Sequence, residues 1–181
     1  HWDWQLPADV PGAPAGPFRA PLADYSQREY GNRVGVFRIL KILDKYRVKP
    51  TMAMDKTVAE SYPYLVTECK KRKLEVMAHG TTARRPIHSG MTPDIERAYI
   101  KDSIGAVTKA MGKAPAGWLG PDFAESMNTP NLLAAEGIRY VCDWSNDEQP
   151  YKMKVPQGEL YSVGVDYDTD DIFIHWTGRR L

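Results

Sequence analysis

Side chains capable of acid–base chemistry follow several apolar segments, at the point where each segment ends. His79 follows "LEVMA", Asp143 follows "IRYVC", and Asp147 comes shortly after it. The carboxyl ends of parallel strands form one rim, where active sites of α/β folds lie. An imidazole and carboxylates at such a rim suit general acid–base work on water, which predicts catalytic roles for all three residues. A structural histidine and a turn-capping aspartate are the alternatives.

Four further side chains are predicted to contact a substrate. Trp118 and Trp144 offer flat faces for a planar ring or a sugar, or else belong to the core. Glu125 and Asp171 can accept hydrogen bonds from ring N–H groups. Alternatively, Glu125 is an acidic residue in the first turn of a helix or a solvated charge in a loop. Asp171 is alternatively part of a solvated acidic loop, "DYDTDD" over 166–171.

The second histidine of the segment "HGTTARRPIHSG", His88, lies nine residues after His79. Nine residues place two side chains on opposite sides of a helix or of a strand. A loop could still bring them together, but Arg84 and Arg85 next to His88 would repel a cation. We therefore expect His79 alone in the site, and no metal ligated by the pair.

The elements that position these residues alternate along the chain. Val36, Ile39, Leu40 and Leu43 predict an apolar helix face, and Thr92 and Thr129 are expected helix N-caps. Strands are predicted over 49–54, 74–79, 116–120, 138–144, 159–165 and 171–176. Helices are predicted over 27–46, 57–73 with a break near Pro63, 92–112 and 129–137. This order predicts an α/β fold with a parallel sheet or barrel.

Composition narrows the class of protein. With a net charge of +1 and no apolar run near 18 residues, we expect no nucleic acid and no membrane as partner. Cys69 and Cys142 match no metal or redox spacing and are expected to be buried thiols. Together with an opening that does not resemble a signal peptide, this predicts a cytoplasmic protein. Residues 7–26, rich in proline, are expected to form a long loop.

Several motifs in order resemble the polysaccharide deacetylase (NodB-homology) superfamily, and most closely its branch of metal-independent allantoinases and cyclic-imide hydrolases. The motifs are "REYGNRVGVFRILKILDKY", "AHG", "APAGWLGP", "GIRYVCDWSNDEQPY" and "DYDTDD", spread over about residues 25–172. The resemblance implies a distorted (β/α) barrel and hydrolysis of a carbon–nitrogen bond that is not a peptide bond.

The sequence departs from the metal-dependent deacetylases of this superfamily. Their His-x-x-x-His pair is matched by His79 but has Ala83 at its second position, and Leu119 stands in place of the arginine of their Arg-x-Pro motif. We therefore expect no cofactor, with a divalent metal such as zinc at His79 as the alternative. The resemblance also implies a strand before residue 1 and a segment after residue 181. We thus expect 1–181 to be one catalytic domain, a fragment of a longer one, whose open sheet favours a homo-oligomer.

Three functions stay open on this basis. The first is opening of a cyclic amide, imide or ureide ring of a small-molecule substrate, with backbone N–H groups near residues 120–122 stabilising the oxyanion. The second is metal-dependent deacetylation of an amino sugar in a polysaccharide. The third is a catalytically inactive relative that binds a ligand through the same rim.

Overall fold

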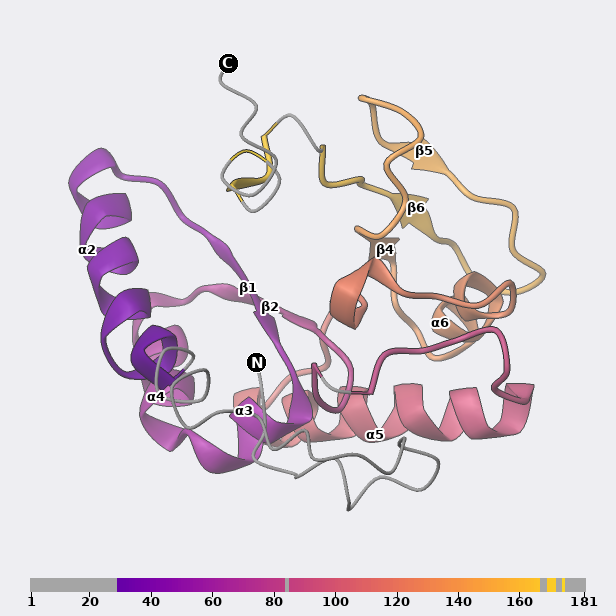
Figure 1. Ribbon diagram of the computed structural model, residues 1–181, viewed down its shortest axis with the longest axis horizontal. Helices are drawn as coiled ribbons and strands as arrows, with labels where there is room; N and C mark the ends of the chain where they lie inside the picture. The colour runs from indigo at the N-terminus through magenta and orange to yellow at the C-terminus, as the bar shows by residue number, and fades with distance from the viewer. Residues whose placement is uncertain (1–28, 84, 167–168, 172–173, 175–181) are drawn as a thin grey trace, which may run out of the picture.

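The computed structural model describes residues 29–83, 85–166, 169–171 and 174, and its centre is a six-stranded sheet (Figure 1). The order across the sheet is β1-β2-β3-β4-β6-β5, with all neighbours parallel except the antiparallel pair β5–β6. The strands are β1 (Thr51–Met54), β2 (Glu75–Ala78), β3 (Gly117–Trp118), β4 (Tyr140–Val141), β5 (Tyr151–Lys152) and β6 (Tyr161–Ser162). The predicted α/β class with parallel pairing is confirmed.

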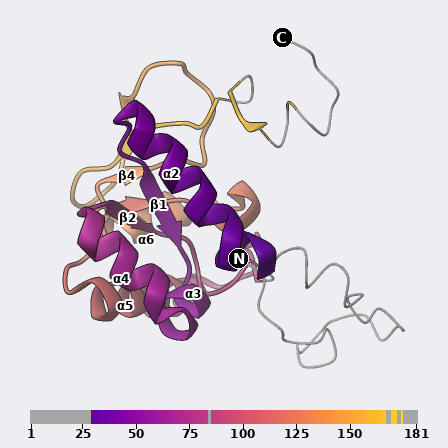
Figure 2. The same ribbon diagram turned by 90° about the vertical axis from the view of Figure 1, so that its left-hand side faces the viewer.

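Helical segments follow the strands β1, β2 and β3 in sequence. The long helix α5 contacts β2 and the helices α3, α4 and α6, while α2 lies on the β1 side of the sheet (Figures 1 and 2). The helical segments are η2 (Gly31–Gly35), α2 (Val36–Tyr46), α3 (Lys56–Ser61), α4 (Pro63–Arg72), α5 (Pro93–Met111), η3 (Pro121–Phe123) and α6 (Thr129–Ala135). None of the helices in the described part of the chain is long and apolar enough to cross a membrane.

Local capping signals account for several of these ends. The Thr92 hydroxyl accepts the Ile95 N–H at 3.4 Å, and α5 ends at Gly112, whose φ of +80° favours glycine. The break at Pro63, which starts α4, is also confirmed. The cap predicted at Thr129 is wrong. Thr129 is the first residue of α6, and its fully buried hydroxyl is used in a tertiary contact with Glu96.

The second half of the sheet differs from the prediction. β4 covers only two residues of the predicted strand 138–144, and β5 with its antiparallel pairing to β6 was not predicted. The predicted strand 171–176 lies mostly outside the described residues, and its described members Asp171 and Ile174 are helical. The predicted loop 7–26 lies outside the described residues altogether. In this half of the sheet, β4, β5 and β6 each pair with their neighbours over only two residues.

The apolar face of α2 is only partly covered. Leu40 is 3% exposed and belongs to the core, whereas Ile39 is 59% exposed. The helix lies at the β1 edge of the sheet, so only the stripe through Val36, Leu40 and Leu43 turns inward. The prediction was right for that stripe and wrong for Ile39. Elsewhere both cysteines are buried and unbridged, as predicted.

Candidate active site

One row of residues across the sheet sets up the site. Met54, Ala78, Trp118, Val141 and Ser162 are paired in register on neighbouring strands. Pairing continues one residue further, because the next N–H groups along β2, β3 and β4 still donate to the preceding strand at 3.0 Å. The residues that follow this row therefore share one rim, and they begin with Asp55, His79, Leu119, Cys142 and Val163.

His79 is held at this rim in a defined tautomer. Its Nδ1 lies 2.6 Å from the carbonyl oxygen of Leu119, which follows the neighbouring strand β3. A carbonyl oxygen can only accept a hydrogen bond, so Nδ1 carries the proton and Nε2 of the neutral ring presents a lone pair. Burial lowers the pKa of His79, against the opposing effects of the Leu119 carbonyl and the negative charge of Asp55. The ring is thus neutral near pH 7, with Nε2 able to accept a proton or bind a ligand.

The Leu119–Gly120 peptide links His79 to Asp143. Its carbonyl accepts from His79, and its N–H donates to both carboxylate oxygens of Asp143, at 2.8 and 2.9 Å. A Cβ at Gly120 would lie 2.9 Å from Asp143 Oδ2 and 2.8 Å from the carbonyl oxygen of Ala124, so only glycine fits. Of the backbone N–H groups near residues 120–122 that were predicted to stabilise an oxyanion, the Gly120 N–H is therefore already engaged by Asp143.

Glu125 completes this group of contacts. Its Oε2 accepts the indole N–H of Trp144 at 2.6 Å, and its carboxyl group lies close enough to that of Asp143 for each group to shift the pKa of the other. Burial and the Asp143 carboxylate raise the pKa of Glu125 to about 9. Burial also raises the pKa of Asp143, while hydrogen bonds from Glu125 and the Gly120 N–H oppose the rise. A protonated Glu125 beside an ionised Asp143 is the arrangement that these shifts favour at neutral pH.

The loop that carries Glu125 has a strained backbone and is held in place by hydrogen bonds to α5. Asp122 and Phe123 have φ of +57° and +54°, left-handed conformations that cost roughly 1–2 kcal/mol for each non-glycine residue. Glu96 of α5 is fully buried and accepts hydrogen bonds from the hydroxyls of Ser126, at 2.6 Å, and Thr129. These contacts attach the loop to α5 and so fix where Glu125 lies.

The turn that directly follows His79 in the chain is also constrained. Gly80 has φ of +71°, and a Cβ there would lie 2.2 Å from the hydroxyl of Tyr99. The Gly80 carbonyl accepts from Ser103 at 2.8 Å, a buried contact with α5. Asp55 is fully buried and accepts the Val58 N–H at 2.7 Å, which starts α3. The sequence pair His79-Gly80 thus encodes an exit from β2 that aims the imidazole at β3.

The structure brings together His79, Asp143, Glu125 and Trp144 from the predicted set. Trp118 is elsewhere: it is fully buried in the core, so it offers no exposed ring face for a ligand to stack on. Trp144 is half-buried and packs partly against the core. Of the two alternatives for Trp118, a substrate contact or a core aromatic, the structure therefore favours the core aromatic.

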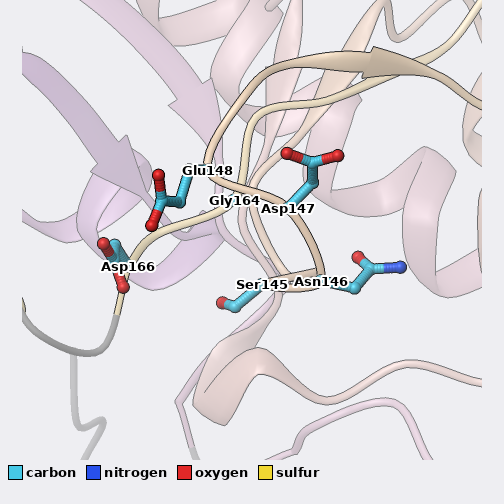
Figure 3. Close-up of a pocket in the computed structure, with 6 residues that line it drawn as sticks. All are labelled: Ser145, Asn146, Asp147, Glu148, Gly164 and Asp166. Carbon is cyan, nitrogen blue, oxygen red and sulfur yellow. The ribbon is translucent and has the colours of Figure 1, made fainter.

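Asp147 lies outside this group. It is exposed, accepts the Gln149 N–H at 2.9 Å, and lines an open depression of about 260 Å³ after β4. Figure 3 shows the carboxylates of Glu148 and Asp166 on one side of this depression, and Asp147 with Asn146 on the other. Among the described residues, no hydrogen bond joins Asp147 to His79 or Asp143. Asp171, also exposed, lies near the end of the described chain.

The donor groups of the described residues do not fit a metal site. No group of three or more His, Cys, Asp or Glu side chains is placed there to hold an ion. His88 is exposed, and its Nδ1 accepts the Gly90 N–H at 3.2 Å, within its own turn. Ala83 supplies no ligand at all. No step below is therefore derived through a metal.

Sequence reasoning missed the residues that connect the site. The sequence did not predict that the Leu119–Gly120 peptide links His79 to Asp143. It also did not predict roles for the buried Glu96 or for Tyr99, whose hydroxyl accepts the Thr81 N–H at 3.1 Å. The one available signal was Gly120 itself, a glycine directly after an apolar strand, which indicates a close approach of another group to the backbone.

Comparisons with known proteins agree with this architecture. The sequence profile described as "Polysaccharide deacetylase" matches residues 29–141. A peptidoglycan deacetylase of Helicobacter pylori is 30% identical over 150 residues, which is 81% of this chain and 49% of that protein.

Solved structures give the same result. A structure from Mycobacterium smegmatis that is assigned to the polysaccharide deacetylases has a TM-score of 0.76 at 29% identity, over 83% of this chain and 54% of that one. A crystal structure of Puue allantoinase has a TM-score of 0.74 at 26% identity, over 84% and 50% of the two chains. The chain thus spans about half the length of the relatives that it matches.

Proposed function

The chain belongs to the polysaccharide deacetylase family, a family of hydrolases that act on carbon–nitrogen bonds, and from that premise we propose that it opens the ring of a cyclic amide, imide or ureide. The observation that carries this proposal is the hydrogen bond from His79 Nδ1 to the Leu119 carbonyl. It leaves Nε2 as a positioned base on a ring that burial keeps neutral.

In the proposed reaction, Nε2 of His79 takes a proton from water as the water oxygen attacks a carbonyl carbon of the ring. The tetrahedral intermediate collapses when the carbon–nitrogen bond breaks, and the imidazolium returns the proton to the leaving nitrogen. Water supplies both the oxygen and the protons, so the products are a carboxyl group and, on the opened chain, an amine from a cyclic amide, an amide from an imide or a urea group from a ureide. Asp143 does not take part in the proton transfer of this scheme, because both its oxygens accept the Gly120 N–H.

The half-buried Trp144 is a candidate surface for the planar ring of such a substrate. Its indole N–H is fixed by Glu125, which holds the ring plane at the rim. An aromatic face of this kind can stack on a flat imide or ureide ring. The similarity to an allantoinase structure, at a TM-score of 0.74, supports the same class of substrate.

The second candidate is removal of an acetyl group from an amino sugar. It is favoured by the 30% identity to a peptidoglycan deacetylase. Against it stand Ala83 in place of a second histidine and the lack of a three-ligand cluster among the described residues.

One experiment separates the two functions. The purified protein is assayed on hydantoin and succinimide for ring opening, and on N-acetylglucosamine oligomers for acetate release, with and without a chelator. We expect ring opening that survives chelation and is lost in His79→Ala. His88→Ala is the matched control, because it removes an exposed imidazole of the same segment and should keep full turnover. Acetate release that a chelator abolishes would instead establish the second function.

A further inference from the structure

We propose that Glu125 and Asp143 share one proton, carried by Glu125, and that this pair positions His79 through the Leu119–Gly120 peptide. The shared proton is a property of the folded chain, independent of any substrate. Its importance for turnover rests on the function proposed above.

The contacts of Glu125 call for a proton on one of its oxygens. Oε2 accepts the indole N–H of Trp144 at 2.6 Å, but Oε1 is buried and receives no hydrogen bond from the described residues. A buried carboxylate oxygen without a donor is costly, whereas a protonated oxygen becomes a donor itself. The acceptor that we assign to it is the neighbouring carboxylate of Asp143, whose proximity is one of the causes of the raised pKa of Glu125.

Asp143 is the partner that keeps the negative charge. Both its oxygens accept the Gly120 N–H, at 2.8 and 2.9 Å, and charge-assisted bonds of this kind favour the ionised form. Two half-buried carboxylates that lie side by side cannot both be ionised without strong repulsion. The other acidic groups facing the pair, Glu96 from α5 and the thiol of Cys142 from the end of β4, offer no positive charge to offset a second anion.

The pKa of each group agrees with this division. Burial, the hydrogen bond to Asp143 and its charge raise the pKa of Glu125 to about 9. The pKa of Asp143 rises to only about 6, because Glu125 and the Gly120 N–H stabilise its charge. Glu125 therefore carries the proton near pH 7.

The effect of the pair reaches His79 through one rigid unit. A peptide group is planar, and in the trans form its C=O and N–H point in opposite directions. Asp143 holds the N–H of Gly120 on one side, so the carbonyl of Leu119 must point to the other side, where it meets His79 Nδ1 at 2.6 Å. Release of Asp143 would free this peptide to rotate and would remove the bond that selects the Nδ1–H tautomer.

The test uses Glu125→Gln and Glu125→Ala. Glutamine keeps a donor toward Asp143 and an acceptor for Trp144 without a titratable proton, while alanine removes both. Infrared spectroscopy of the wild type at pH 7 should show a protonated carboxyl group that is absent from Glu125→Gln. Nitrogen NMR of the His79 ring should show the Nδ1–H tautomer in the wild type and in Glu125→Gln, and a tautomer mixture in Glu125→Ala.

Turnover gives the second readout. We expect kcat to fall by about a hundredfold in Glu125→Ala, the size of loss that misplacement of a catalytic group causes, and to fall clearly less in Glu125→Gln, which keeps a donor toward Asp143. Because Glu125→Gln and the wild type are compared directly, a poorly folded alanine variant leaves the test intact.

Two results would overturn the proposal. The first is a wild type without a protonated carboxyl group at pH 7. The second is a Glu125→Gln variant that keeps the His79 tautomer but loses turnover like Glu125→Ala, since Glu125 would then pass its proton to the substrate. A wild type that turns over no substrate would contradict the proposed function, while the infrared and NMR results would still decide the shared proton.

Discussion

Replacing Gly120 by alanine tests the central contact of the site. The added Cβ would lie 2.8 Å from the backbone oxygen of Ala124 and 2.9 Å from Oδ2 of Asp143, and both distances are shorter than real Cβ contacts. The Ala124 oxygen belongs to the backbone of a strained loop and cannot swing away, so Asp143 must move and give up the Gly120 N–H. Overpacking of this kind costs about 1–3 kcal/mol, and a hydrogen bond to a charged group contributes about 1.5–3 kcal/mol. We therefore expect Gly120→Ala to lower the free energy of unfolding by about 3 kcal/mol, within the range of these two costs.

The assay is urea unfolding followed by far-UV circular dichroism, with Gly105→Ala as the matched control. Gly105 is an exposed glycine in α5, and a Cβ added there would have no atom within 4 Å, so alanine should stabilise the helix by roughly 0.5–1 kcal/mol. The two glycine-to-alanine changes thus have opposite expected signs. If Gly120→Ala unfolds at the same urea concentration as the wild type or above it, the close approach of Asp143 to Gly120 is refuted.

Three further predictions follow from the same contacts. Since burial and the Asp143 carboxylate raise the pKa of Glu125 to about 9, the folded protein holds a proton there that the unfolded chain releases above pH 4.5. The contribution of this group to stability should be fully present below pH 4.5 and should be lost, by up to about 1.4 kcal/mol per pH unit, as the pH rises toward 9; urea titrations at several pH values should show a smaller loss over this range in Glu125→Gln. Asp143→Asn keeps an acceptor for the Gly120 N–H but loses the carboxylate that Glu125 donates to in the proposed pair. We therefore expect the free energy of unfolding to decrease by about 1–3 kcal/mol and turnover to drop. Equal stability would make Asp143 a simple turn residue. His88→Ala should change neither the urea midpoint nor the bound-metal content measured by elemental analysis, because His88 is exposed and bonds only within its own turn; loss of metal would restore the shared-ion interpretation.

The sequence was sufficient wherever the signal is local. Thr92 and Gly112 mark the ends of α5, and Pro63 separates α3 from α4, because capping groups and proline act on their own turn of helix. The same holds for the rim: His79 and Asp143 each follow an apolar strand, and parallel pairing places the ends of such strands at one edge. These predictions needed only periodicity and neighbours along the chain.

Tertiary structure alone decided how the site is connected. Nothing near Glu125 in sequence shows that its carboxyl group meets Asp143, and Thr129 looks like a helix cap until its hydroxyl is seen bonded to Glu96 on α5. The bond from His79 to the Leu119 carbonyl spans 40 residues and depends on the register of β2 and β3. A sequence specifies which groups are available for such contacts, but burial and geometry, which arise only when distant segments pack, determine which proton each group holds.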